Sequence, residues 1–533
     1  MNFLRKLISR LTRWRLALIC LIVVYAVLLS LDLSYMSMQW DEVNHFNGGL
    51  LLIRGQFQRY VETSSFYPPM FNLVTALYFA VAGASVFVGR FVAVTFSLLT
   101  VVVVYKIAGR MYEAKTALLS AVLFAVMPGI VWLSRMAMIE TMLTFVFSLS
   151  MLLFYKWLTT NQDNERKKSL AAAAAGVAVK YQTLVVAPII MVASMLVFGK
   201  SAYLKTQLAS LLKPRRLILV AAVAAVAAAF VYVLYSSGIL NVWLYAIQVG
   251  TADKSLYSVR FPAPIFYLVE MTWPYSDVHP ISLLLYAAGL AGLGLLAYRR
   301  KPGDKFLLVW FIAVYAVFTL IPNRQWRYVT LLFPVLAISA AALLASALGK
   351  AQKNWQKTQR SLPKRLTAKF AAAALIAFTA TGVFLSCSDA YTWVAKDQVQ
   401  VPVEQATAYA AQALSPNQSV VIACPLNFLN NDMVWFYLNI KVPSQSQVWQ
   451  YPELAADVYT PKFDLAEFTV LCRQRDARYV LLYEYGWTAR YFQTDLTPQA
   501  VYDMLLDSGD FALAASFGEE PKRVFVLTFT SEP

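Results

Sequence analysis

The chain has 533 residues, of which 59% are hydrophobic, and its mean hydropathy of +0.55 excludes an ordinary soluble globular protein. Its formal net charge of +17 could indicate nucleic-acid binding, but the basic residues cluster beside apolar segments, as topology signals do. We therefore predict a polytopic integral membrane protein with membrane lipids, and no nucleic acid, among its partners.

The first apolar segment lies at about residues 16–34 and follows a basic N-terminal stretch. It is too long for the core of a signal peptide and has no clear small-residue cleavage site before the acidic loop. We therefore expect a retained anchor with a cytoplasmic N-terminus. The basic residues before it are Arg5, Lys6, Arg10, Arg13 and Arg15.

Further apolar runs are long enough to cross about 30 Å of hydrocarbon as helices. They predict an all-α polytopic membrane domain of about eleven transmembrane helices over residues 1–387. We expect the spans near residues 16–34, 90–110, 115–133, 138–158, 169–181, 183–199, 217–236, 281–298, 306–321, 327–347 and 370–387.

Five basic stretches lie between these segments, and each successive pair is separated by two predicted helices, so all five share one side of the membrane. The basic N-terminus joins them only if the apolar segment 70–88 does not cross. We therefore expect 70–88 to form a juxtamembrane or re-entrant helix in the first outer loop of a multi-pass plasma membrane protein. The stretches are Lys106/Arg110/Lys115, 166–168, 200–216, 299–305 and 350–369.

Residues 388–533 lack the long apolar runs of the preceding chain. By the same count of membrane crossings, we expect them on the extracytoplasmic side. Runs such as 419–423 and 479–483 are typical of buried strands, and amphipathic stretches at 402–414, 463–475 and 497–508 are typical of helices. We predict a C-terminal extracytoplasmic α/β domain. The four cysteines show no metal-ligand spacing, and whether one disulfide forms near this region stays open.

The predicted outer face collects most of the ionisable residues that flank helix ends. Such groups are unfavourable at membrane depth and usually pair, line a cavity or serve function. Both histidines of the chain belong to the set. Its members are Asp41, Glu42, His45, Arg54, Arg59, Arg90, Arg135, Glu140, Lys180, Arg260, His279, Arg324 and Arg327.

Each of these residues has a structural and a functional interpretation. In the structural interpretation Asp41 and Glu42 cap a helix, and in the functional one Asp41 is a general base beside a lipid-embedded substrate. In the structural interpretation the arginines contact lipid headgroups, and in the functional one they bind a lipid-linked phosphate. Lys180 interrupts an apolar run and either snorkels to the interface or faces a cavity.

Two further features keep similar alternatives. Glu140 fits a helix cap, or a ligand for a divalent cation together with Asp41, Glu42, His45 or His279, although no ligand spacing selects a metal. Tyr67-Pro68-Pro69 forms a rigid turn, and the aromatic residues of the first loop fit an interface belt or a sugar platform.

Several motifs together resemble those of glycosyltransferases of the C-type membrane fold. The similarity is greatest to glycosyltransferase family 39, the dolichyl-phosphate-mannose protein mannosyltransferases, and to the related lipid A aminoarabinose transferases. It covers about the first 200 residues and recurs at 322–336. The motifs are Trp40-Asp41-Glu42-Val43-Asn44-His45, Phe66-Tyr67-Pro68-Pro69-Met70, Gly89-Arg90-Phe91, residues 134–141, and Arg327-Tyr328 before Phe333-Pro334.

The resemblance implies inverting transfer of a sugar from a polyprenyl-phosphate carrier to an acceptor hydroxyl on the extracytoplasmic face. The family's catalytic aspartate maps onto Asp41 and its neighbour onto Glu42. Donor phosphate ligands are expected among Arg90, Arg135, Lys180, Arg324 and Arg327. The substrate pocket is expected to include His45, Tyr67, Glu140 and Tyr328.

Two departures from the family concern the substrates. Glu140 stands where many relatives have aspartate, and Tyr67 stands where the protein mannosyltransferases usually have histidine. The protein mannosyltransferases also carry a different large outer domain. Because this sequence lacks it, the resemblance does not select a protein acceptor, and a protein, a lipid and a glycan all stay open. No cofactor is required by this chemistry, with a divalent cation as the open alternative.

Three alternative functions have sequence requirements of their own. A transporter or flippase of lipid-linked sugars would need access from both faces and often shows repeated halves, which this sequence lacks. A non-catalytic assembly subunit would have lost the acidic pair, which is present. Transfer of a whole oligosaccharide stays open within the enzyme class.

Overall fold

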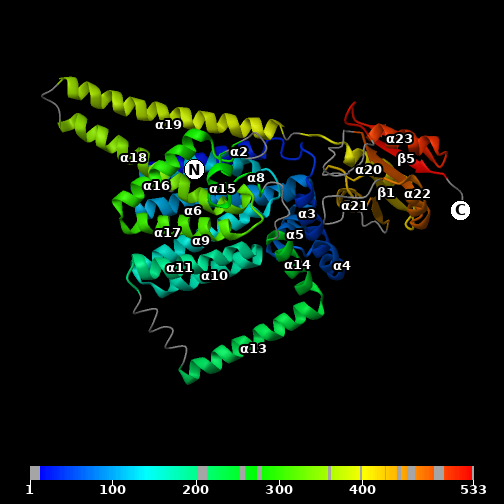
Figure 1. Ribbon diagram of the computed structural model, residues 1–533, viewed down its shortest axis with the longest axis horizontal. Helices are drawn as coiled ribbons and strands as arrows, with labels where there is room; N and C mark the ends of the chain where they lie inside the picture. Colours follow the sequence, from blue (N-terminus) through cyan, green and yellow to red (C-terminus); the bar gives the residue numbers. More distant parts are fainter. Residues whose placement is uncertain are drawn as a thin grey trace, which may run out of the picture. The chain divides into compact units, whose positions relative to one another are not determined.

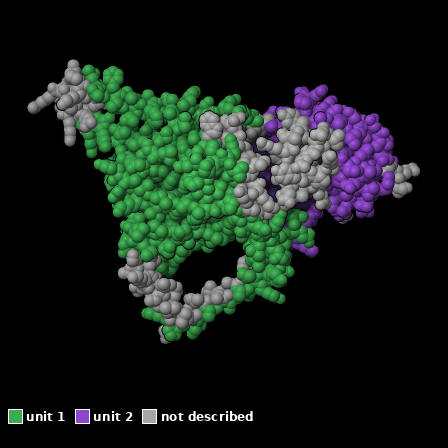
Figure 2. Space-filling view, viewed as in Figure 1, with its two compact units in different colours: residues 1–31, 61–71, 90–396 green, residues 32–60, 72–89, 397–533 purple. Residues whose placement is uncertain are grey.

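The computed structural model describes residues 12–200, 213–251, 258–272, 279–357, 362–396, 399–425, 428–440, 446–452, 463–484 and 497–530. The basic residues before position 12 and most of the basic stretch 200–216 lie outside the described residues. The chain forms two compact units (Figure 2). The first unit comprises residues 1–31, 61–71 and 90–396, and the second comprises 32–60, 72–89 and 397–533.

The first unit is helical, as its long apolar runs predict (Figure 1). Its helices are α2 (Arg13–Ser30), α6 (Val86–Met111), α7 (Ala114–Ala125), α8 (Pro128–Ser134), α9 (Ile139–Thr160), α10 (Asp163–Val179), η1 (Tyr181–Val185), α11 (Val186–Val192), η2 (Ala193–Val197), α13 (Pro214–Ser236), α14 (Ile239–Thr251), α15 (Ala263–Glu270), α16 (Leu283–Arg299), α17 (Pro302–Leu320), η3 (Trp326–Leu332), α18 (Phe333–Lys357) and α19 (Leu362–Lys396).

Six helical stretches in the described part of the chain are long and apolar enough to cross a membrane. They are α2, α6, α9, α17, residues 326–353 and residues 369–396. The segment predicted as one span at 115–133 is instead two helices, α7 and α8, bent by 64° where Pro128 begins the second. The count of eleven spans stays a prediction.

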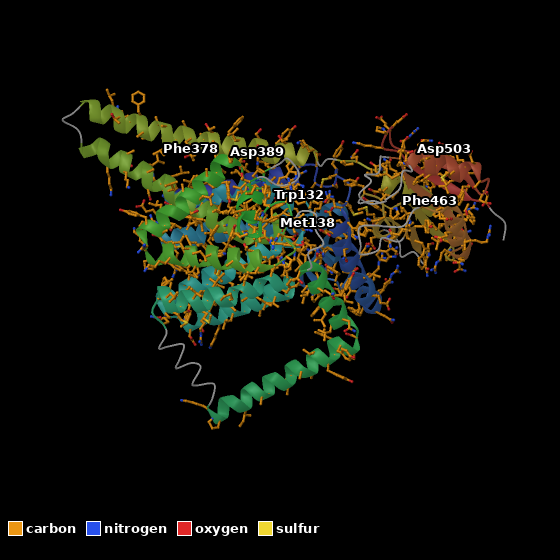
Figure 3. The ribbon with its side chains drawn as sticks, viewed as in Figure 1. Trp132, Met138, Phe378, Asp389, Phe463 and Asp503 are labelled. Atoms are coloured by element: carbon orange, nitrogen blue, oxygen red, sulfur yellow. The ribbon has the colours of Figure 1, made fainter. Side chains whose placement is uncertain are left out.

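Aromatic and polar contacts join neighbouring helices of the first unit. α18 lies beside α16, α7 and α19, and Figure 1 shows α18 and α19 running side by side. Trp132 of α8, labelled in Figure 3, stacks on Trp393 of α19 with ring centroids 5.2 Å apart. Asp389 of α19, also labelled, accepts a hydrogen bond from Ser282 at 2.6 Å.

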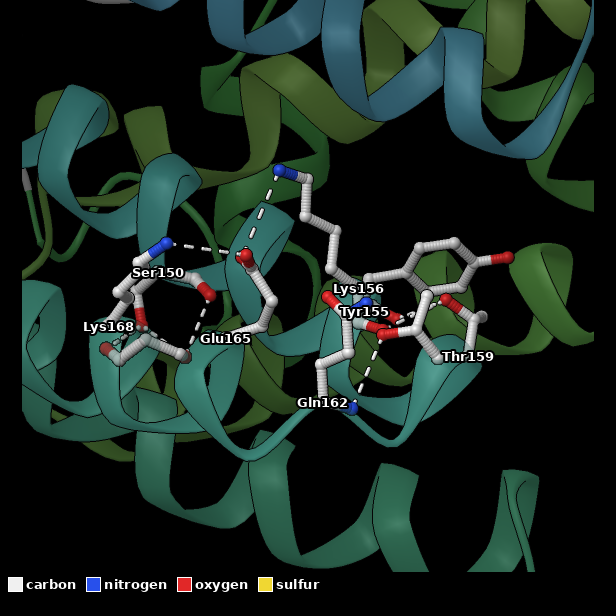
Figure 4. Close-up of polar contacts among 9 residues, drawn as sticks. Ser150, Tyr155, Lys156, Thr159, Gln162, Glu165 and Lys168 are labelled. Carbon is white, nitrogen blue, oxygen red and sulfur yellow. Dashed lines mark hydrogen bonds and ion pairs between the residues drawn. The ribbon is translucent and has the colours of Figure 1, made fainter.

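Polar contacts close the hairpin between α9 and α10 (Figure 4). The Ser150 hydroxyl donates to the Ser169 carbonyl at 3.0 Å. Glu165 lies between two lysines, with its carboxylate 3.9 Å from Lys156 and 3.4 Å from Lys168. The Lys168 side chain is 63% exposed and that of Glu165 is 15% exposed, so the pair with Lys168 is open to solvent on its lysine side.

Three helices follow α2: α3 (Trp40–Ile53), α4 (Phe57–Ser64) and α5 (Met70–Ala82). The helix predicted over residues 70–88 is shorter in the structure and ends at Ala82. The next residue, Gly83, has a positive φ of 82°, which ends the helix. At 13 residues, α5 is about 20 Å long and shorter than the hydrocarbon core of a bilayer.

The C-terminal part of the second unit is an α/β fold around a five-stranded sheet of order β2-β1-β3-β5-β4. Strands β2, β1 and β3 are parallel, whereas β5 is antiparallel to both β3 and β4. The elements are α20 (Val403–Gln412), β1 (Ser419–Ala423), α21 (Asn431–Asn439), β2 (Val448–Tyr451), α22 (Leu465–Gln474), β3 (Ala477–Tyr483), α23 (Pro498–Asp507), β4 (Phe511–Phe517) and β5 (Val524–Phe529).

The predicted strands at 419–423 and 479–483 are confirmed, and β1 is buried over its whole length. The core of this fold includes Phe463, labelled in Figure 3, and Phe468. Cys424 and Cys472 also lie in this core, and all four cysteines are free.

Candidate active site

A buried ion pair joins the first turn of α9 to the end of α10. Glu140 Oε1 accepts a hydrogen bond from Lys180 Nζ at 3.0 Å, and the two side chains are 2% and 4% exposed. Moving a charge from water into a protein interior is unfavourable unless a close partner offsets the lost hydration. Each of these two charges is therefore stable in the first unit because the other is present.

Two tyrosine rings also lie near the Lys180 ammonium. Its Nζ lies 5.5 Å from the ring centroid of Tyr67 and 5.4 Å from that of Tyr328. A cation within about 6 Å of an aromatic centroid is attracted to the electron-rich face. The Tyr-Pro-Pro turn and η3 supply the two rings, so Tyr67, Glu140, Lys180 and Tyr328 converge on one point.

The Glu140 carboxylate is only half bonded. Its Oε2 is buried and has no hydrogen-bond partner among the described residues. Arg327 of η3 acts on it electrostatically, while the Arg327 Nε donates to Gln325 at 2.8 Å. A buried acceptor without a partner is uncommon in folded proteins and is often filled by a ligand or an ordered water.

The local backbone explains how Lys180 reaches this point. α10 ends at Val179 because Lys180 adopts extended backbone geometry, and its N–H bonds the Gly176 carbonyl at 2.8 Å. A Cβ at Gly176 would lie 2.5 Å from Thr183 Cγ2. Glycine at 176 therefore lets η1 fold closely against the end of α10.

Two arginines predicted to bind donor phosphate contact backbone carbonyls. Arg135 Nη1 donates to the Leu29 carbonyl at 3.0 Å, in the last turn of α2. A cation is favoured there by the helix dipole. Arg324 donates to the carbonyls of Thr319 and Ser258, both at 3.3 Å. Their role toward a donor stays a prediction.

Arg90 is in a different situation, because its side chain on α6 is fully buried. A guanidinium keeps its charge at all physiological pH values, so burial requires polar or charged partners. Arg90 is not without an interaction partner in the structure. Phosphate binding by Arg90 stays a prediction.

The acidic pair lies at the start of α3, in the second unit. The Gln39 N–H donates to Glu42 Oε2 at 3.1 Å, and Glu42 is fully buried. Glu42 therefore caps the helix, the structural alternative expected from its sequence position. Asp41 is half-buried in the same first turn, where the helix dipole favours a negative charge.

His45, one turn after the acidic pair, is bonded within the second unit. Its Nδ1 lies 2.7 Å from Asn72 Oδ1, and the Asn72 amide donates to the Tyr60 hydroxyl at 3.4 Å. With Asn72 oriented in this way, the imidazole Nδ1–H is the donor. Asn72 was not among the predicted site residues, although a polar residue in the mostly apolar helix α5 was a usable signal.

A metal centre was an open alternative. Among the residues that the structure describes, no group of three or more His, Cys, Asp or Glu side chains could hold a metal ion. Around Glu140, Lys180 makes an ion pair and Arg327 acts electrostatically, and two cations near one carboxylate suit an anionic ligand better than a cation.

Comparison with known proteins assigns this architecture. Residues 67–235 match the family described as dolichyl-phosphate-mannose-protein mannosyltransferase. The structure of ArnT from Cupriavidus metallidurans bound to undecaprenyl phosphate superposes with a TM-score of 0.60 at 16% sequence identity, covering 96% of this chain and 97% of that chain. The protein has the fold of the C-type membrane glycosyltransferases. The resemblance predicted from the sequence motifs is confirmed.

Two more distant C-type structures show the same fold. The Archaeoglobus fulgidus oligosaccharyltransferase in the apo form matches with a TM-score of 0.52 and 14% identity over 87% of this chain and 69% of that chain. Arabinofuranosyltransferase AftD from Mycobacteria matches with a TM-score of 0.51 and 12% identity over 96% of this chain and 41% of that chain. No curated protein sequence matches. The apolar helices and this C-type fold identify an integral membrane protein.

Proposed function

We propose that the protein is an inverting glycosyltransferase that moves a hexosyl or pentosyl group from a polyprenyl-phosphate carrier to an acceptor hydroxyl on the extracytoplasmic face of the membrane. The observation that carries the proposal is the Lys180 ammonium, buried between a half-bonded carboxylate and two tyrosine rings in a protein of this fold. ArnT, which shares the fold, is described as bound to undecaprenyl phosphate.

The cationic groups of the first unit suit the leaving group. As the bond between the anomeric carbon and the phosphate oxygen breaks, its electron pair moves onto the phosphate and negative charge develops there. Lys180 and Arg327 supply fixed positive charge for that change, and such charge is worth more in a site without water than in solution. Polyprenyl phosphate is the product that leaves.

Asp41 is the proposed general base. Its carboxylate takes the proton from the acceptor hydroxyl while the acceptor oxygen forms a bond to the anomeric carbon, on the face opposite the departing phosphate. The assignment rests on the motif Trp40-Asp41-Glu42 and on the half-buried position of Asp41 in the first turn of α3. Glu42 then supports this turn as its cap.

The sugar and the acceptor are decided by experiment. Purified full-length protein is incubated with labelled undecaprenyl-phosphate esters of mannose, glucose, arabinose and aminoarabinose, and the label is followed into protein, lipid and glycan fractions. We expect one donor to be consumed with label appearing in one fraction. No transfer from any polyprenyl-phosphate sugar, with intact protein, would contradict the proposed reaction.

The role of Asp41 is tested with Asp41→Asn in the same assay. We expect turnover to fall by at least about a thousandfold with binding of undecaprenyl phosphate unchanged, because the base acts only in the chemical step. Asp163→Asn, which alters an exposed carboxylate of the first unit, is the matched control and should keep full turnover. Normal turnover by Asp41→Asn would remove Asp41 as the base.

A further inference from the structure

Helix α21 of the C-terminal α/β fold packs against α3, the helix that begins with the acidic pair. Both helices belong to the second unit. α21 has a well-defined start, because the Asn430 side chain caps it by accepting the Met433 N–H at 3.0 Å. The two helices are far apart in the sequence, so their contact depends on tertiary structure alone.

Two polar contacts fix how α3 lies along α21. Near the start, Asn47 Nδ2 donates to the Asp432 carbonyl at 3.1 Å. At the other end, Arg54 Nη1 donates to Asn439 Oδ1 at 3.4 Å, and Arg54 Nη2 donates to the Asn439 carbonyl. Arg54 follows Asn47 by the same seven positions as Asn439 follows Asp432. The helices therefore run in the same direction and in register over two turns, about 10 Å.

Aromatic packing fills the space between these two contacts. Phe46 is fully buried, and its ring centroid lies 5.4 Å from that of Phe436 on α21 and 6.2 Å from that of Phe79 on α5. Phe79 and Phe436 are 6.4 Å apart, so the three rings form a closed cluster. Gly89 permits it, because the Phe46 ring occupies the space that a Cβ at position 89 would need.

The helix after α3 is held in the same way. The Arg59 guanidinium of α4 lies over the Trp435 ring of α21, 4.6 Å from its centroid. α21 thus contacts both α3 and α4 through residues spread over its length. A helix of 14 residues such as α3 is marginally stable alone, so its position is set by tertiary contacts.

We infer that α21 is the positioning element for the catalytic helix, with Phe436 and Asn439 as positioning residues that fix where Asp41 stands. The inference rests on the proposed role of Asp41 as the base. A displacement of a catalytic group by about 1 Å lowers the rate by about a hundredfold, so a shift of α3 lowers turnover without removing any group that touches substrate. The C-terminal fold then has a direct part in the chemistry, in addition to any part in acceptor access.

The test combines hydrogen–deuterium exchange with kinetics on the full-length protein in lipid nanodiscs. The variants are Phe436→Leu and Asn439→Ala. Phe468→Leu is the matched control, since it makes the same substitution at a fully buried site in the core of the same α/β fold. Exchange is followed in peptides covering residues 40–53 and, as an internal reference, residues 139–160.

We expect both test variants to raise exchange in residues 40–53 by about tenfold or more and to leave residues 139–160 unchanged. Turnover with the donor identified from the undecaprenyl-phosphate panel should fall by about tenfold or more, at an unchanged KM for that donor. Phe436→Tyr, which keeps the ring, should restore both values. Phe468→Leu should change neither the exchange of residues 40–53 nor turnover.

Two results would overturn the inference. One is unchanged exchange in residues 40–53 in both test variants. The other is increased exchange with normal turnover while Asp41→Asn is inactive, because α3 would then be loosened without consequence for the base. An active Asp41→Asn variant would instead refute the proposed function and with it the catalytic purpose of this positioning.

Discussion

Two buried carboxylates stand in the first turns of membrane helices, and they differ in how completely they are bonded. Asp304 of α17 is fully buried and accepts hydrogen bonds from the Tyr112 hydroxyl at 2.7 Å, from Arg299 Nε at 2.7 Å and from the Lys301 N–H at 3.1 Å. Arg299 Nη2 adds a bond at 2.5 Å, so both oxygens are engaged.

Glu140 of α9 is nearly as buried but has one oxygen on Lys180 and the other without a hydrogen-bond partner among the described residues. A saturated carboxylate stabilises the fold and has no bonding capacity left for a substrate. A half-bonded one keeps such capacity. The difference indicates that the Asp304 network is structural and that the Glu140 cluster is available to a ligand.

The largest effect is expected from Lys180→Ala. Removing the ammonium leaves the Glu140 carboxylate buried without its counter-ion, which lowers the free energy of unfolding by about 3–5 kcal/mol. We also expect loss of undecaprenyl phosphate binding, measured by native mass spectrometry, because the cation proposed to bind the donor phosphate is gone.

The double variant Glu140→Gln/Lys180→Gln separates these two effects. It buries no net charge, so its thermal unfolding should return toward that of the parent protein, while binding of undecaprenyl phosphate should stay weak. Binding at parental affinity in the double variant would contradict the role of Lys180 toward the donor.

Asp304→Asn should have a smaller effect of a different kind. The Arg299 guanidinium loses its charged partner, which lowers the free energy of unfolding by about 1.5–3 kcal/mol. Sugar transfer per folded molecule should not change, as urea titration and kinetics on the same preparation would determine. A loss of kcat in the folded fraction would mean that this network also serves the reaction.

Asp432 of α21 shows what burial does to a carboxylate outside the membrane segments. Burial raises the pKa of Asp432 to about 6, above its ordinary value. The folded state therefore binds the proton more tightly, so stability is greatest below about pH 4 and falls as the pH rises toward 6. Asp432→Asn should raise the free energy of unfolding at pH 7 by about 2 kcal/mol and leave it unchanged at pH 4. An equal gain at both pH values would contradict the raised pKa.

The smallest effect is expected at the hairpin between α9 and α10. Lys168→Gln removes an exposed ion pair with Glu165, and such pairs contribute about 0–1 kcal/mol. Thermal unfolding and sugar transfer should both stay at parental values. A large loss of thermal stability or of sugar transfer in Lys168→Gln would contradict this expectation. It would mean that the exposure of a charged side chain does not indicate how much it contributes.

Much of the fold could be predicted from the sequence, because apolar run length and alternation are local signals. α9, α17, β1, α20, α22 and α23 lie close to their predicted ranges, whereas α21 was not predicted. Local signals failed where tertiary packing decides the element ends. The bend at Pro128 and the start of α6 at Val86, four residues before its predicted first residue, were not foreseen.

The individual residues of the Glu140 cluster could be named from the sequence, but their contacts could not. Glu140 was singled out at the start of a helix and Lys180 as a charge in an apolar run, whereas their ion pair was not predicted. Nothing local could assign Arg135 to the carbonyls of α2, because that contact joins residues about a hundred positions apart. The partnership of Arg54 with Asn439 spans 385 positions and likewise has no signature in periodicity or spacing.

That separation of 385 positions has a consequence for biosynthesis. Ribosomes add about 5–20 residues per second, so α3 leaves the exit tunnel roughly 20 to 80 seconds before α21 exists to receive it. During that interval α3, which carries the acidic pair, is part of a nascent chain and has no contacts with α21. A polypeptide released early, before residue 431, never acquires them, so the final packing of α3 depends on translation reaching the last quarter of the message.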